Sequence, residues 1–91
     1  MKYRVEQTSK FRKELKKVLK RGKDKTKLLK VVRLLADGKQ LPEQYKDHAL
    51  IGDYAGFRDC HIEPDWLLIY AIDQGALVLS LTRTGSHSNL F

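Results

Sequence analysis

The segment Trp66–Ile72 limits the folds open to this chain more than any other part of the sequence. It is almost wholly apolar, so it is expected to be a strand whose two faces are both covered, in the middle of a sheet. Turn residues lie on both sides of it, at Glu63–Asp65 and at Asp73–Gly75. Neighbouring strands are therefore predicted at Phe57–Ile62 and Ala76–Arg83.

The first 40 residues follow a different pattern. Tyr3–Gln7 alternates between side-chain types, which predicts a short strand. Apolar residues then recur at helical spacing in two segments, the first capped by Thr8 or Ser9 and ended by Gly22. The second ends at Asp37 and Gly38. Because only a few residues join these helices, we expect them to pack as an antiparallel hairpin.

The order of elements defines the fold class. After Pro42 the helical pattern gives way to short strands, the first at Ala49–Ile51. One strand, two helices and four further strands predict an α+β fold, with a two-helix hairpin on one face of a small curved antiparallel sheet. A chain of 91 residues makes one domain, which we place at residues 1–91. Residues 85–91 form a tail that must pack to be ordered.

Charge is distributed very unevenly along the chain. Residues 1–40 contain 15 Lys and Arg against 4 Asp and Glu, whereas residues 41–91 contain 3 against 7. So many like charges around one helix repel each other, which favours a surface that binds a polyanion over a merely solvated one. A nucleic acid, an anionic membrane face or an acidic protein would each fit this charge. The predicted contacts to an RNA backbone are Lys10, Lys13, Lys16, Lys17, Lys20, Arg21 and Lys23.

Several classes of protein are disfavoured by what the sequence lacks. It has no apolar run of about 18 residues and no secretory leader, so we expect no membrane association. The single cysteine, Cys60, fits the reducing cytoplasm. Cys60 and His61 point to opposite faces of a strand, and no paired Cys or His spacing is present, so we expect neither a metal nor a cofactor.

All three histidines lie in the second half of the chain. The pleat of its strand places His61 with Phe57 and Asp59, on the face opposite the apolar Cys60 and Ile62. His61 should therefore face away from the helices. A solvent-facing histidine is ordinarily without function, and the same holds for the other two.

His48 and His87 each have a simple structural explanation. His48 lies in a loop, where it could pair with the adjacent Asp47. His87 lies in the C-terminal tail, which could be disordered.

Three other residues allow two explanations each. Arg83 has the same strand parity as the apolar row Leu77, Leu79 and Leu81, where a charge cannot stay. It is therefore either a strand-end arginine held by an acid such as Asp65, or a phosphate-binding group. Asp65 could orient a histidine, act as a base or cap its turn. Trp66 is more typical of a core residue than of a platform on which bases stack.

Together these residue types match one kind of chemistry. RNA cleavage without a metal needs a base for the 2′-hydroxyl proton, an acid for the leaving 5′-oxygen and a cation beside the phosphate. Histidine can serve as the acid and the base near neutral pH, and arginine can serve as the cation. The sequence contains no P-loop and no Gly-x-Ser-x-Gly elbow.

The chain resembles a known family, the YafQ-type messenger-RNA interferases of the RelE/ParE toxin superfamily. The resemblance covers essentially the whole chain. The long middle segment is its most specific part. The matching segments are Tyr45–His48, Gly56–Tyr70, Arg83–His87 and Leu90–Phe91.

The resemblance implies a RelE-like fold and a ribosome-dependent endoribonuclease that cuts messenger RNA and is neutralised by a cognate acidic antitoxin. It further implies an acid–base cluster, a phosphate-stabilising arginine and basic helices that contact ribosomal RNA. We expect His87 to be the general acid and His48, His61 or Asp65 the base. The expected catalytic residues are His48, His61, Asp65, Arg83 and His87, with Phe91 and Trp66 beside them as substrate contacts.

Two other functions stay open at this stage. ParE-type relatives share the scaffold but inhibit DNA gyrase without cutting RNA, and a non-catalytic RNA- or antitoxin-binding module would have incidental histidines. A cluster of the three histidines in space would favour the nuclease, because neither alternative needs paired acid–base groups.

Overall fold

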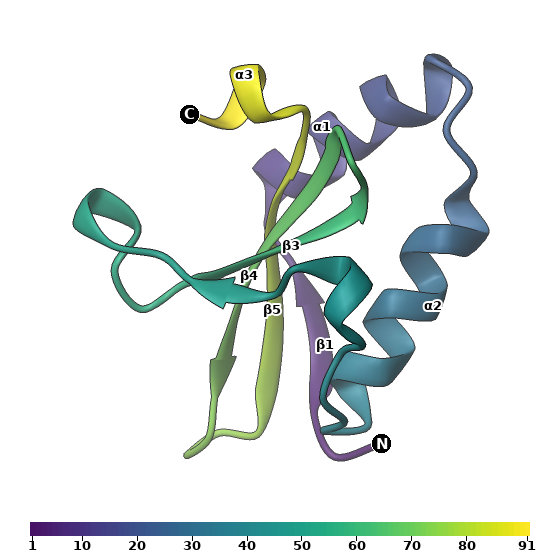
Figure 1. Cartoon of the computed structure of the whole chain (residues 1–91). Coiled ribbons are helices and arrows are strands. Elements are labelled where there is room, and N and C mark those ends of the chain that lie inside the picture. The colour runs from purple at the N-terminus through teal and green to yellow at the C-terminus, as the bar shows by residue number, and fades with distance from the viewer.

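The computed structural model covers residues 1–91 and has the predicted α+β architecture (Figure 1). A five-stranded sheet has the strand order β1-β5-β4-β3-β2, and no helix is long and apolar enough to cross a bilayer. The elements in chain order are β1 (Arg4–Gln7), α1 (Ser9–Lys20), α2 (Lys25–Ala36), β2 (His48–Ala49), β3 (Arg58–Glu63), β4 (Trp66–Asp73), β5 (Val78–Gly85) and α3 (His87–Leu90), with single 3-10 turns at Glu43–Tyr45 and Gly52–Tyr54.

The sheet is mixed, which corrects the expectation of a purely antiparallel one. Strands β2 to β5 pair antiparallel, but β1 lies parallel to β5 with Arg4 opposite Val78 and Gln7 opposite Leu81. The alternation of a four-residue strand shows which side chains share a face, but it does not show the direction in which the strand pairs.

The two long helices cover one face of the sheet, and each is held mainly by a strand. Helix α1 packs on β5, and α2 packs on β3. The Thr8 hydroxyl accepts from the Phe11 N–H at 3.0 Å and donates to the Thr82 carbonyl at 2.7 Å, so one cap residue both starts α1 and ties it to β5. The expected hairpin is therefore correct in its connection, but the helices pack against the sheet more than against each other.

Strand β4 contributes to a core on each of its faces, as its apolar composition predicts. Leu68 and Tyr70 face the helices, where the larger core also contains Phe11 of α1 and Val31 of α2. Alternate residues of β4 point to the other side. There Leu67 and Ile69 form a small second core with Leu90 of α3. The tail is ordered because Leu90 is buried in this second core.

An extra residue in β5 reverses which way its side chains point. Leu81 lies opposite Tyr70 and Arg83 lies opposite Ile69, so Thr82 has no partner of its own. Leu81 consequently faces the helix-side core, while Arg83 faces the other side with Ile69. The bulge explains how an arginine follows a row of leucines without entering their core.

Candidate functional site

Four residues form one row across the face of the sheet that the long helices leave uncovered. His48 pairs with Asp59, Asp59 with Ile69, and Ile69 with Arg83. Residues directly opposite each other on adjacent strands share a face, so these side chains lie on the same side. Strands are about 4.8 Å apart, which places the backbone of Arg83 roughly 10 Å from that of Asp59.

Asp59 is the centre of the histidine cluster. The residue is 2% exposed, and its Oδ1 has no hydrogen-bond partner. His61 is on the same face of β3, with its Nε2 4.0 Å from that Oδ1. Burial raises the pKa of Asp59, while the charges of His48, His61 and His87 act to lower it. His48 thus lies opposite Asp59 on the adjacent strand, His61 lies 4.0 Å from its carboxylate, and the charge of His87 also acts on it.

The tautomers of two histidines follow from their backbone contacts. The carbonyl of Lys46 lies 2.8 Å from Nδ1 of His48, and the carbonyl of Pro64 lies 3.2 Å from Nδ1 of His61. A carbonyl oxygen only accepts, so Nδ1 carries the proton in each ring. In the neutral form Nε2 is then free to accept a proton. Both rings therefore have the form that a general base requires.

His48 is held in place by its neighbours and not by Asp47, the partner that the sequence offered. Asp47 accepts hydrogen bonds from Arg58, with Nη2 at 2.9 Å, and from the hydroxyl of Tyr70. Because Arg58 and Tyr70 lie on β3 and β4, the bonds fix the segment that leads into β2. Burial and the Asp47 carboxylate together raise the pKa of Tyr70, which keeps its hydroxyl a donor.

His87 and Phe91 are positioned by α3. Leu90 anchors this helix in the second core, while His87 and Phe91 stay exposed. The ring centroids of His87 and Phe91 are 5.1 Å apart, and Phe91 lies edge-on to Tyr54 at 5.7 Å. A half-exposed aromatic ring next to an imidazole is suited to stack on a base of single-stranded RNA.

Arg83 is held by Glu14 of α1 and by Tyr54, not by Asp65. Its Nη2 lies 2.7 Å from Oε2 of Glu14, and its Nη1 donates to the Tyr54 hydroxyl at 2.9 Å. The Glu14 carboxylate raises the pKa of Arg83 further above its ordinary value, so the side chain is always a cation. Through Tyr54 and Phe91 it is linked by contacts to His87.

Asp65 and Trp66 make none of the hydrogen bonds that hold the histidines. Asp65 is exposed and lines a hollow of about 140 Å³ with Arg21, Lys23 and Ser86. Trp66 is 1% exposed, and its Nε1–H donates to the Thr84 hydroxyl at 2.9 Å. Such a ring cannot stack on a substrate, so we correct the expected substrate contact and assign Trp66 to the core.

The basic residues of α1 line a hollow beside the site. It measures about 450 Å³, with Arg83 and Glu14 in its wall. Four of the seven residues predicted to contact an RNA backbone line this hollow: Lys10, Lys13, Lys17 and Arg21. Lys16 and Lys20 are exposed elsewhere on α1. Lys23 forms an ion pair with Glu63 at 2.7 Å.

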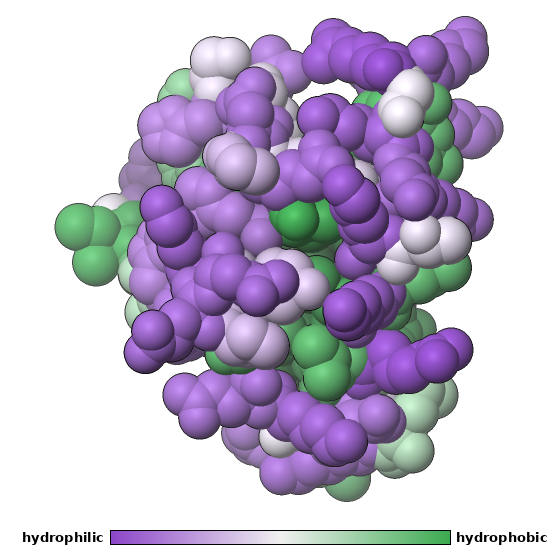
Figure 2. Space-filling view, turned by 45° about the vertical axis from the view of Figure 1, so that its right-hand side comes forward, coloured by the Kyte–Doolittle hydropathy of each residue, from purple (hydrophilic) through white to green (hydrophobic).

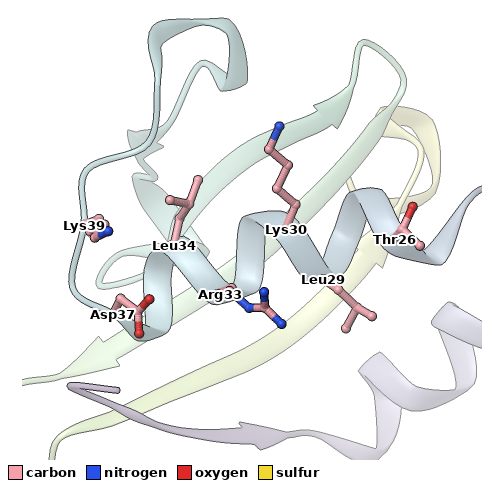
Figure 3. Close-up of a pocket in the computed structure, with 7 residues that line it drawn as sticks. All are labelled: Thr26, Leu29, Lys30, Arg33, Leu34, Asp37 and Lys39. Carbon is pink, nitrogen blue, oxygen red and sulfur yellow. The ribbon is translucent and has the colours of Figure 1, made fainter.

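A second basic surface lies on the outer side of α2. It has a hollow of about 420 Å³ lined by three cations, two leucines, Thr26 and Asp37. Figure 3 shows these side chains, with Lys30, Arg33 and Lys39 as the cations and Leu29 and Leu34 as the leucines. Leu29 is 50% exposed. The space-filling view that brings the α2 side forward shows a mainly hydrophilic surface with small apolar patches (Figure 2).

Three residues of the site were missed by the sequence reasoning. Asp59 could have been found, because it shares the face of His61 on one strand. Glu14 could have been noticed as the only acid in α1. Nothing in the sequence marks Tyr54, because its role depends on how the loop before β3 folds back. No group of three or more His, Cys, Asp and Glu side chains is arranged as a metal site.

Comparison with known proteins places the chain in a family. The family model described as "Bacterial toxin of type II toxin-antitoxin system, YafQ" matches residues 3–91. The mRNA interferase toxin YafQ of Escherichia coli strain K12 is 42% identical over 88 residues, which are 96% of this chain and 94% of that protein.

Solved structures agree with this match. A metal-bound toxin from Helicobacter pylori has a TM-score of 0.92 at 46% identity over 100% of both chains. In the E. coli DinJ-YafQ toxin-antitoxin complex, the matching chain has a TM-score of 0.89 at 40% identity, over 100% of this chain and 99% of that one. This chain belongs to the YafQ family of toxins from type II toxin–antitoxin systems. The resemblance read from the sequence is thereby confirmed.

Proposed function

We propose that this chain is a messenger-RNA interferase, an endoribonuclease that cuts messenger RNA on the ribosome by acid–base catalysis without a metal. The observation that carries the proposal is the grouping of His48, His61 and His87 around the buried Asp59, with Arg83 in the same row of the sheet. The related E. coli protein is named an mRNA interferase toxin.

The geometry supports two candidate bases, one acid and one cation for the phosphate. Nε2 of His48 or of His61 takes the proton from the 2′-hydroxyl, and the resulting oxygen attacks the adjacent phosphorus. His87 gives a proton to the departing 5′-oxygen, and Arg83 stabilises the charge on the phosphate. The products are a 2′,3′-cyclic phosphate and a free 5′-hydroxyl. We take the imidazoles as the base in preference to Asp65, because each of the two presents a free Nε2.

The basic hollow of α1 supplies the means to bind a ribosome. Its lysines and Arg21 line the same hollow as Arg83. Several cations in one hollow are suited to bind RNA phosphates. Since ribosomes and messenger RNA are its proposed partners, the cytoplasm is its proposed location.

A cognate antitoxin is the second proposed partner. The related YafQ of E. coli forms a complex with DinJ. An acidic segment with a few apolar side chains would complement the basic surface of α2, where three cations line a hollow together with Leu29 and Leu34.

The central test compares the wild-type chain with His87→Ala after induction. Transcripts are mapped by primer extension in a translating extract, with and without ribosomes. We expect cleavage only with ribosomes, and products that end in a cyclic phosphate. His87→Ala should lose about 10²- to 10⁴-fold in rate, while Ser88→Ala, an exposed neighbour on α3, serves as the matched control.

Two outcomes would redirect the proposal. Equal growth arrest by wild type and His87→Ala would favour a toxin that is not a nuclease, such as a gyrase inhibitor. Arg83→Ala is expected to lose cleavage while ribosome binding persists. Loss of binding in that variant would assign Arg83 to docking.

A further inference from the structure

Glu14 is an unusual residue for its position. It is the only acid in α1, a helix that contains six Lys and Arg. It also lines the basic hollow. A surface that binds a polyanion is weakened by a free carboxylate, because like charges repel. The carboxylate is not free, however: its side chain is 17% exposed, and its partner Arg83 is 16% exposed.

Both oxygens of Glu14 are occupied by the end of β5. Oε1 accepts from Nε of Arg83 at 3.3 Å, and Oε2 accepts from Nη2 at 2.7 Å. Oε1 also lies 3.4 Å from the backbone N–H of Thr84. Strand β1 pairs with β5 only as far as Leu81, so this part of β5 is an open edge. Glu14 therefore holds the guanidinium and the backbone that carries it.

The hydrogen bonds leave part of the guanidinium unoccupied. An arginine side chain has five N–H groups in one plane. Glu14 takes one on Nε and one on Nη2, and Tyr54 takes one on Nη1. Two remain, one on each Nη. Each of these N–H groups is a charged donor that suits a phosphate oxygen.

We propose that Glu14, assisted by Tyr54, is a positioning residue of the nuclease: it fixes the plane of Arg83 and leaves two N–H groups for an RNA phosphate. The proposal rests on the proposed function. A guanidinium that is already held in place loses less conformational freedom when the phosphate binds. The carboxylate thus serves the transition state without touching the RNA.

The test uses Glu14→Gln and Tyr54→Phe in single-turnover cleavage on programmed ribosomes. Glutamine keeps the shape but presents an amide to a donor, and phenylalanine removes only the hydroxyl while keeping the contacts of the ring with Phe57 and Phe91. We expect kcat to fall about 10-fold or more for Glu14→Gln and less for Tyr54→Phe, with KM for ribosomes within about 2-fold. Glu6→Gln, which alters an exposed ion pair with Arg4, is the matched control.

A double-mutant cycle separates positioning from a general structural role. If Glu14 acts through Arg83, Glu14→Gln causes no further loss in an Arg83→Ala background. Independent, multiplicative losses would overturn the proposal, as would a change in KM alone. Faster cleavage by Glu14→Gln would also overturn it, because Glu14 would then compete with the phosphate. If Glu14→Gln fails to fold, Tyr54→Phe in the same cycle decides. Absence of cleavage by the wild-type chain would instead refute the proposed function.

Discussion

Asp59→Asn should make the protein more stable and less active. A buried carboxylate without a hydrogen bond to Oδ1 is costly to ionise. Asparagine removes the charge and keeps nearly the same shape. Cleavage should fall about 10-fold, which corresponds to about 1.4 kcal/mol of transition-state stabilisation, because the His61 ring, 4.0 Å from the carboxylate, loses a negative neighbour when it takes the proton of the 2′-hydroxyl. We expect the free energy of unfolding at pH 8 to rise by about 1 kcal/mol.

The pH dependence of this gain has a definite sign. The pKa of Asp59 is raised in the folded protein, so the folded state binds the proton more tightly than the unfolded chain does. Wild-type stability from this group is therefore greatest below the unfolded pKa and is lost as the pH rises through the folded pKa. The advantage of Asp59→Asn should accordingly shrink between pH 8 and pH 4.

Thermal unfolding followed by circular dichroism at several pH values is the assay. About 1 kcal/mol corresponds to a rise in Tm of about 4–8 °C for a chain of this size. Asp53→Asn, a change at an exposed aspartate, should leave Tm unchanged at every pH. A lower Tm for Asp59→Asn at pH 8, or a gain that does not vary with pH, would refute the reasoning.

Three further changes test other parts of the structure. Leu90→Ala removes the anchor of α3, so it should lower the free energy of unfolding by about 3 kcal/mol and abolish cleavage while ribosome binding persists. Retained cleavage would show that α3 does not position His87. Trp66→Phe loses the hydrogen bond to Thr84, so the free energy of unfolding should fall by about 1 kcal/mol with kcat unchanged. A lower kcat at unchanged stability would instead assign Trp66 to substrate binding. Lys13→Gln with Lys17→Gln should weaken ribosome binding and reduce its salt-dependence slope by about 0.7 per lysine, whereas Lys25→Gln, outside this hollow, should not.

The main elements of the fold could be predicted because their patterns are strong. The apolar run at Trp66–Ile72 did identify the central strand, and the helical spacing before Gly22 did identify α1. The parallel pairing of β1 with β5 could not be predicted, because the relative direction of two strands depends on the path that the chain takes in space between them. Helix α3 was missed because four residues are too few for a periodic signal, and it depends on the burial of Leu90.

The site was predictable in residue types more than in geometry. Side-chain alternation correctly placed His61 away from the helices, because one strand determines it. The partner of Arg83 was wrong in the sequence reading, since Glu14 is 69 residues away and approaches only at the open edge of β5. Asp59 stands out because its carboxylate is buried without a hydrogen bond to Oδ1, and burial cannot be seen in the sequence.

The extra residue at Thr82 makes the length of β5 matter as much as its composition. Deleting it would turn the Arg83 side chain toward the leucines and out of the row that contains His48 and Asp59. A homologue whose β5 is one residue shorter at this point would therefore keep the scaffold but lack the proposed cation for the phosphate.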